Sequence, residues 1–163
     1  MFRFLLPLML IAPLFASTAA AAQPAVQLIP VEYTSPNRTA VDSIKAGNHD
    51  CPHCDLAGAD LTNTCVKGGN LEGAKFDNAR AVLMCMSYAD FKGASFRNTD
   101  LAGANLAHAN VDDADFTGAD LSITSIKGTD LRHANGLTQA QLDRACGDAD
   151  TRVPDGMQVK MCS

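Results

Sequence analysis

An apolar residue recurs at every fifth position over half of the chain, and this period constrains the fold more than any other feature. The series begins at Leu56 and ends at Leu131, and every position in it is apolar. A period of five matches neither the 3.6-residue period of an α-helix nor the two-residue period of a single strand. The segment is therefore predicted to be an internal repeat with its own geometry.

The five-residue units share one plan. A small residue comes two places before the large apolar one, a polar residue lies between them, and Gly or Asn often follows two places later, as around Ala59-Asp60-Leu61 and Ala119-Asp120-Leu121. Two inward side chains followed by a residue that tolerates a left-handed backbone indicate short sides joined at corners. This plan explains why 47% of the chain is hydrophobic although only 6% is aromatic: the core is narrow.

These Ala-Asp-Leu-x-Gly units resemble the pentapeptide-repeat family over about residues 54–135. The resemblance implies that five residues form one side of a coil and that four sides complete it. The implied fold is an all-β solenoid, a right-handed quadrilateral β-helix of about four coils, with short helical caps at both ends. Four coils at about 4.8 Å per rung give a stack of roughly 20 Å.

Residues 20 apart should then lie above one another. One interior column is predicted to be a core ladder: Leu56, Phe76, Phe96 and Phe116. One outer column alternates in charge: Glu72, Lys92, Asp112 and Arg132. Opposite charges on adjacent rungs contribute a few tenths of a kcal/mol or more each. Both columns favour the 20-residue coil independently of the resemblance.

Residues 1–22 have the pattern of a signal peptide. Arg3 precedes an apolar run of about 13 residues, and small residues surround a cleavage site near 20–22. The run is shorter than the roughly 20 residues of a spanning helix, so the alternative of an uncleaved anchor is disfavoured and no transmembrane segment is expected in the mature chain. The predicted location is periplasmic or secreted, where disulfides persist.

Two capping segments are expected around the repeat of residues 51–135. Residues 23–50 are predicted to be a linker and a capping helix over 36–47 that ends at Gly47. Residues 136–163 are predicted to be a helical cap and tail, because Thr138 and Gln141 form a capping-box pattern. Gly147 is expected to end this second helix. Such caps are needed because a solenoid exposes unpaired edges at its ends.

The cysteines give several disulfide candidates. Cys146 and Cys162 bracket the tail and are natural partners. Cys65 and Cys85 occupy the same outward position on adjacent coils, about 4.8 Å apart and within bonding range. Because parallel neighbours are not ideally aimed at each other, two stacked thiols without a bond are the alternative.

The segment Cys51-Pro52-His53-Cys54 carries the most specific chemical motif. The same four residues occur in strongly oxidising periplasmic thiol oxidoreductases, which place them on a thioredoxin-like scaffold. Here the motif runs directly into the first repeat, which favours a local bridge or cap. Together with His49 it also forms a Cys/His cluster for Zn²⁺ or Cu⁺, but its compact spacing argues against four ligands, so no metal and no cofactor are expected. A thiol-disulfide redox or metal-binding protein is thus the alternative function.

No catalytic machinery is apparent in the sequence. It has no Gly-rich phosphate loop, no Gly-x-Ser-x-Gly motif and no His-Glu-x-x-His motif. The densest acidic patch, Asp112, Asp113 and Asp115, has the composition of a solvated face. A formal net charge of −5 argues against nucleic acid as a partner. Some proteins of the resembled family are acidic rods that engage type II topoisomerases, but the export signal and short stack argue against that role.

Four apolar residues are expected to point outward as an interaction patch: Val82, Leu83, Tyr88 and Ile123. Exposed apolar patches often mark partner sites. The sequence therefore predicts no enzyme but a binding or structural module of the bacterial periplasm or cell envelope, acting through the outer faces of the solenoid. Its partner is an unknown protein or a second copy of the chain.

Overall fold

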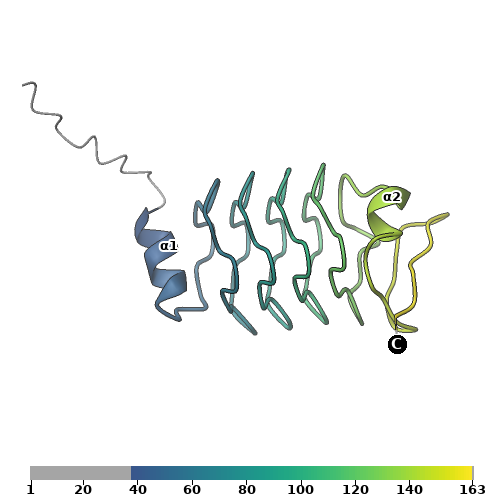
Figure 1. Cartoon of the computed structure of the whole chain (residues 1–163), viewed down its shortest axis with the longest axis horizontal. Helices are drawn as coiled ribbons and strands as arrows, with labels where there is room; N and C mark the ends of the chain where they lie inside the picture. The colour runs from purple at the N-terminus through teal and green to yellow at the C-terminus, as the bar shows by residue number, and fades with distance from the viewer. Residues whose placement is uncertain (1–37, 163) are drawn as a thin grey trace, which may run out of the picture. The chain divides into compact units, whose positions relative to one another are not determined.

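The computed structural model describes residues 38–162, so the predicted signal peptide and the linker before residue 38 lie outside the described residues. Helix α1 (Arg38–Lys45) lies at one end of a stack of coils, and helix α2 (Gln139–Leu142) lies near the other end (Figure 1). Neither of these helices is long and apolar enough to cross a membrane.

Parallel β-bridges hold the coils together. Every bridge between residues 55 and 135 joins two residues 20 apart, as in the series Asp55, Lys75, Ser95. The bridges are isolated, so no continuous strand forms in the described part of the chain. The reason is that each five-residue side bends at its corner before a second consecutive residue can pair. The bridges have the 20-residue spacing that the sequence columns predict.

The interior is a linear core of stacked side chains. Leu56, Phe76, Phe96 and Phe116 all lie in it with no exposed surface. The rings of Phe76 and Phe96 stack with centroids 4.8 Å apart, and those of Phe96 and Phe116 stack at 5.1 Å. Phe91 adds edge-on contacts at 5.8 Å to Phe76 and 5.3 Å to Phe96. Such aromatic pairs stabilise the fold by about 0.5–1.5 kcal/mol each beyond the burial of their area. The ring contacts therefore add stability to a core that is only a few side chains wide.

The corners use a left-handed backbone, and the aspartates stabilise them. Asn63, Asn78 and Asn98 have φ values of 59°, 58° and 53° at the same position of three different five-residue units. Just before such a corner, the Thr62 N–H donates to Asp60 Oδ1 (3.1 Å), and the Ser122 N–H donates to the Asp120 carboxylate (2.9 Å). The recurring Asp residues therefore satisfy turn N–H groups.

The N-terminal end of the described coils is covered by α1. Ile44 is buried and Val41 packs partly against the core, and Gly47 follows with φ 93°. At the other end, Thr138 caps α2 through reciprocal hydrogen bonds with Gln141. Both helices thus lie where the capping patterns predict.

The C-terminal segment departs from the expected helical cap. Helix α2 ends at Leu142, and Gly147 does not terminate it but forms a bridge with Met161. The chain rejoins the stack through the bridges Ser125↔Cys146 and Asp130↔Arg152, which span 21 and 22 residues. One extra residue enters in the segment that contains α2, and a second enters between Cys146 and Arg152, so this segment continues the stack as an irregular coil. A disulfide joins Cys146 to Cys162, with Cα atoms 5.3 Å apart.

The ion pairs predicted between charged residues on adjacent coils do not form. Within the described residues, no ion pair joins the members of the column Glu72, Lys92, Asp112, Arg132 to one another. Arg132 instead binds Asp130 of its own rung at 2.6 Å, and His133 contacts Asp112 at 3.4 Å. The guanidinium of Arg132 donates to both oxygens of Asp130, from Nε to Oδ1 (3.0 Å) and from Nη2 to Oδ2 (2.6 Å), and such a two-point contact is stronger than a single contact to the next rung.

Candidate functional site: an outer face without acidic residues

One side of the stack differs from the others in charge. It consists of the stretches 63–68, 83–88, 103–108 and 123–128, which bridges at positions 65, 85, 105 and 125 place one above another. These stretches contain no Asp or Glu, although the chain has 18 such residues. Their only charged side chains are Lys67 and Lys127. We call this side the acid-free face.

Large apolar side chains stand at one edge of this face. Leu83 is 57% exposed at φ 56°, and Ile123 is 76% exposed at φ 59°. A left-handed backbone is rare for a bulky residue and an outlier for a β-branched one. Leu83 leans over the next coil at Gly103, where an added Cβ would lie 2.7 Å from Leu83 Cδ2. The two large residues of this column are thus separated by a glycine.

A stack of rings forms the opposite edge. Tyr88 is 60% exposed at φ 60°, and its ring lies 5.0 Å from that of His108 one coil further on. The Lys67 ammonium stands 5.8 Å from the centre of the Tyr88 ring, within cation–π range. Of the four residues predicted as an interaction patch, Tyr88 therefore lies apart from Leu83 and Ile123. Val82 is only half-exposed beside the first edge.

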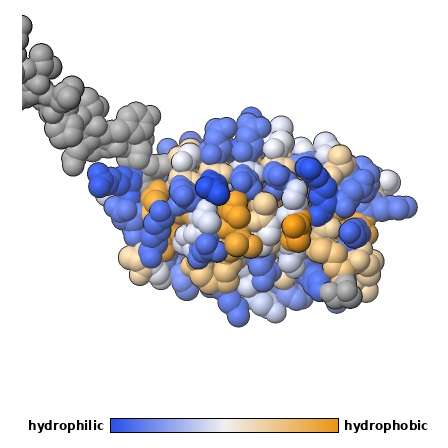
Figure 2. All heavy atoms as spheres, viewed as in Figure 1, coloured by the Kyte–Doolittle hydropathy of each residue, from blue (hydrophilic) through white to orange (hydrophobic). Residues whose placement is uncertain are grey.

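The surface of the molecule carries few strongly hydrophobic side chains in the view of Figure 2. Figure 2 shows a mostly hydrophilic face, with a few strongly hydrophobic side chains over the middle of the stack. In this view the strongly hydrophobic side chains are therefore separate from one another and do not form a broad apolar patch.

Two thiols lie between the edges. Cys65 is exposed, Cys85 is half-buried, and neither is bonded. They form a parallel bridge as predicted from the 20-residue spacing, but the disulfide candidate between them is not made, because side chains on parallel rungs point the same way and not toward each other. Burial, followed by the neighbouring Cys65 thiol, raises the pKa of Cys85.

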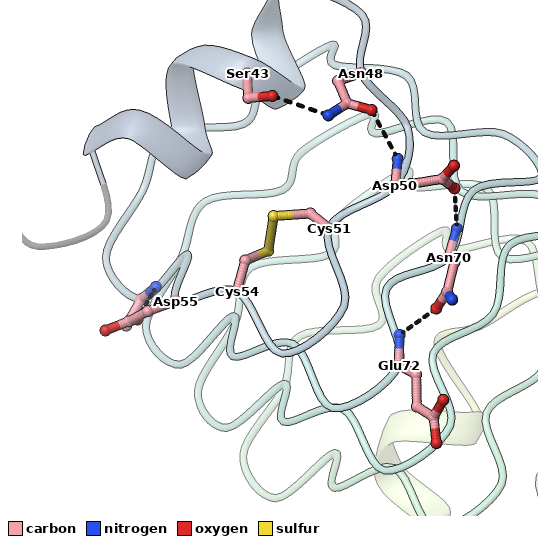
Figure 3. Close-up of a disulfide and its surroundings, with 9 residues drawn as sticks. Ser43, Asn48, Asp50, Cys51, Cys54, Asp55, Asn70 and Glu72 are labelled. Atoms are coloured by element: carbon pink, nitrogen blue, oxygen red, sulfur yellow. Dashed lines mark hydrogen bonds between the residues drawn. A yellow bond between two sulfur atoms is a disulfide. The ribbon is translucent and has the colours of Figure 1, made fainter.

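The disulfide Cys51–Cys54 lies in the first turn of the stack, with Cα atoms 5.5 Å apart (Figure 3). A chain of hydrogen bonds runs beside it from α1 to the second coil: Asn48 Nδ2 to Ser43 Oγ (3.0 Å), Asp50 N to Asn48 Oδ1 (3.2 Å), Asn70 N to Asp50 Oδ1 (2.8 Å) and Glu72 N to Asn70 Oδ1 (3.0 Å). The bridge thus lies at the junction of cap and solenoid.

Two observations bear on the redox and metal-binding alternatives predicted for the motif around this disulfide. The next described helix after Cys51 is α2, far along the chain, so the cysteines lack the helix N-terminus that thioredoxin-like sites use. Within residues 38–162, no group of three or more His, Cys, Asp or Glu side chains could hold a metal ion. The candidates His49, Cys51, His53 and Cys54 therefore do not assemble. His53 instead leans over Gly73 of the next coil.

The acidic sides hold their carboxylates in structural contacts. The Arg132 hydrogen bond lowers the pKa of Asp130 to about 2, and the Thr117 hydroxyl is the main cause of the lowered pKa of Asp115. In the predicted acidic patch, Asp115 also binds Arg97 at 2.6 Å and Asp112 contacts His133. Carboxylates held ionised in this way are poor proton donors near neutral pH.

Sequence reasoning missed several surface features. Met161 is 59% exposed on the terminal rung, and nothing in its local sequence indicates that position. A groove of about 390 Å³ lies between α1 and the first coil, lined by Ile44, His49, Asn63 and Cys65 among others. The Tyr88–His108 stack could have been predicted from the sequence, because two aromatic residues 20 apart lie on adjacent coils.

The sequence model of pentapeptide repeats (8 copies) matches residues 51–82, 85–122 and 99–135, which is the segment that the β-bridges organise into coils. The chain belongs to the pentapeptide-repeat family. Its pentapeptide-repeat neighbours of known structure imply the right-handed quadrilateral β-helix. No curated protein matches this chain.

Two solved pentapeptide-repeat proteins illustrate the similarity. The protein Rfr23 from the cyanobacterium Cyanothece 51142 is 26% identical, with 61% of this chain and 64% of that chain covered and a TM-score of 0.50. A protein from Nostoc PCC 7120 is 30% identical over 74% of this chain and 86% of that chain, with a TM-score of 0.33. This chain thus spans less than two thirds of the Cyanothece protein.

Proposed function

We propose that this pentapeptide-repeat protein is a non-catalytic protein-binding module of the bacterial periplasm or cell envelope, and that it contacts its partner through the acid-free face. The observation that carries the proposal is the pair Leu83 and Ile123, which are exposed and left-handed. A left-handed backbone costs an ordinary residue about 1–2 kcal/mol. Because both side chains are largely exposed, burial offsets only part of this cost, which supports a binding role for these two residues.

The charge distribution supports this choice of face. A chain of net charge −5 repels acidic surfaces generally, but it presents no carboxylate on the acid-free face. A partner can therefore approach Leu83, Tyr88 and Ile123 without opposing acids, and Lys67 and Lys127 attract acidic groups at its rim.

The size of the face indicates a weak or transient interaction. A stack about 20 Å tall and one five-residue side wide, at about 3.3 Å per residue, covers on the order of 300 Å². A stable interface buries roughly 800 Å² on each partner. The face alone is too small for a permanent interface with any partner, so the proposed contact with a separate protein is a transient one.

The location rests on the sequence. Residues 1–22 have the pattern of an export signal, and two disulfides, Cys51–Cys54 and Cys146–Cys162, suit an oxidising compartment. The absence of catalysis is supported by the aspartates, whose side chains are engaged in turn hydrogen bonds. A binding role also fits the pentapeptide-repeat family, whose members are generally structural or interaction modules.

Site-specific photo-crosslinking tests the proposal. A photoreactive residue replaces Tyr88 in the exported protein, and crosslinked species are captured from envelope extract. We expect a discrete heterologous product that Leu83→Asp removes. The matched control is Asn78→Asp, which places the same carboxylate at an exposed corner of equal φ (58°) on another column. A product that survives Leu83→Asp, or is lost equally with Asn78→Asp, contradicts the assignment of this face.

A further inference from the structure

The acid-free face also holds a rigid pair of thiols. Cys65 and Cys85 occupy one outer column, and backbone hydrogen bonds fix their separation: Val66 N–H donates to Cys85 O (2.8 Å), and Cys85 N–H donates to Thr64 O (2.9 Å). Neither cysteine is bonded, and Cys65 is exposed to solvent. From this geometry we propose that Cys65 and Cys85 form a two-sulfur site for a soft metal ion of the Cu⁺ class.

The rung spacing favours a metal bridge over a disulfide. A disulfide requires the two Cβ atoms to converge to about 3.8 Å, whereas parallel rungs hold equivalent atoms about 4.8 Å apart. A metal–thiolate bond is about 2.3 Å long for zinc, so one ion between two sulfurs holds them about 4.6 Å apart. The ladder therefore presents the sulfurs close to the span of a linear sulfur–metal–sulfur unit without backbone movement.

The surroundings select the class of ion. The same column continues with Asn105 and Ser125, so no carboxylate or imidazole from it joins the thiols, and no larger His, Cys, Asp or Glu cluster occurs in residues 38–162. Hard ions such as Mg²⁺ and Ca²⁺ prefer oxygen ligands, and zinc sites use three or four protein ligands, more than the two thiols supply. Thiolates favour Cu⁺, and Cu⁺ accepts two ligands in a line.

Binding of Cu⁺ exchanges protons for the metal ion without a change of oxidation state. Two S–H groups each lose a proton to solvent, two sulfur–copper bonds form, and no electron is transferred because copper enters as Cu⁺. The bound unit carries one net negative charge, and Lys67 lies close enough to act electrostatically on Cys85. The site does not depend on a protein partner and stands apart from the proposed binding function.

A competition experiment tests the site directly. The purified protein, with both disulfides left intact, is titrated without oxygen against the coloured Cu⁺–bicinchoninate complex, and native mass spectrometry counts bound copper. We expect one Cu⁺ per chain. Cys65→Ser and Cys85→Ser should each reduce copper uptake to that of protein whose thiols have been alkylated. Circular dichroism confirms that each variant remains folded.

Register variants separate a two-rung site from general thiol binding. Cys65→Ser combined with Asn105→Cys rebuilds a pair on adjacent rungs, at positions 85 and 105, and should restore uptake. Cys65→Ser combined with Ser125→Cys places the thiols two rungs apart, about 9.6 Å, and should not. Both variants contain the same number of thiols as the native chain.

Three results overturn the proposal. The first is Cu⁺ uptake that persists in either single Ser variant, and the second is equal uptake by the two register variants. The third is a Cys65–Cys85 disulfide in the purified protein, detected as the absence of alkylatable thiols. Loss of the protein partner in crosslinking experiments has no bearing on these outcomes.

Discussion

The change Ile123→Asn should stabilise the protein, although it removes a large apolar side chain. Ile123 has φ 59°, and Asn63 occupies the same column at the same φ. Asn tolerates the left-handed region, whereas a β-branched residue there is an outlier. The substitution therefore removes conformational strain at a position where the fold already accepts Asn.

The magnitude follows from two opposing terms. The left-handed backbone costs an ordinary residue about 1–2 kcal/mol, and Asn avoids a large part of it. Complete burial of an Ile side chain stabilises by about 1.5–3 kcal/mol, but Ile123 is 76% exposed, so the burial lost is about 0.5 kcal/mol. The expected net gain is about 0.5–1 kcal/mol, or roughly 1–4 °C in Tm for a domain of this size.

Urea unfolding followed by circular dichroism measures the gain, and the reverse exchange Asn63→Ile supplies the matched comparison. Asn63→Ile should destabilise by about 1 kcal/mol, because it introduces the same strain at an exposed corner. If Ile123→Asn lowers the free energy of unfolding by more than 1 kcal/mol, Ile123 makes folding contacts and the strain reasoning is refuted. The same variant should also weaken partner crosslinking.

Three further predictions concern the core, the tail and acid. Phe96→Ala should lower the free energy of unfolding by about 3–5 kcal/mol, because Phe96 is fully buried between stacked rings; a loss below 1 kcal/mol in urea unfolding would show that the stack relaxes around the cavity. Cys146→Ser should cost about 3 kcal/mol, since the bridge to Cys162 closes a loop with a separation of 16 residues, and reduction of the native protein, which also opens Cys51–Cys54, should cost at least as much. Asp130 has a pKa lowered to about 2 from 3.8, so its contribution is present above pH 4 and is lost as pH falls from about 4 to about 2; Arg132→Gln should flatten the fall of Tm over that range, and an unchanged slope would contradict the role of this pair.

The sequence predicts the coil because the repeat controls buried positions. The inward column Leu56, Phe76, Phe96 and Phe116 follows from counting by 20, since a one-residue slip would expose every large side chain. The same counting places Cys65 beside Cys85. The register of the coils can thus be predicted from the sequence wherever large side chains must be buried.

Features outside the core were less predictable for a physical reason. Arg132 is long and flexible, so its column neighbours did not determine its partner, and it binds Asp130 of its own rung. Two one-residue insertions, one around α2 and one between Cys146 and Arg152, shift the last bridges to spacings of 21 and 22 residues, where the five-residue period has ended. For the candidate site, the sequence predicted outward Leu83 and Ile123, but the acid-free face requires knowing which stretches share a side.

The overlap of corner side chains with the next coil sets a rule for what this surface can display. A bulky corner residue leans over the coil that follows it, as Leu83 leans over Gly103. Along this column the large apolar anchors Leu83 and Ile123 stand two rungs apart, about 9.6 Å, with Gly103 between them, whereas the flat rings of Tyr88 and His108 occupy successive rungs. The acid-free face therefore presents anchors at a two-rung spacing along one edge and at a one-rung spacing along the other. A partner that binds this face must match both spacings.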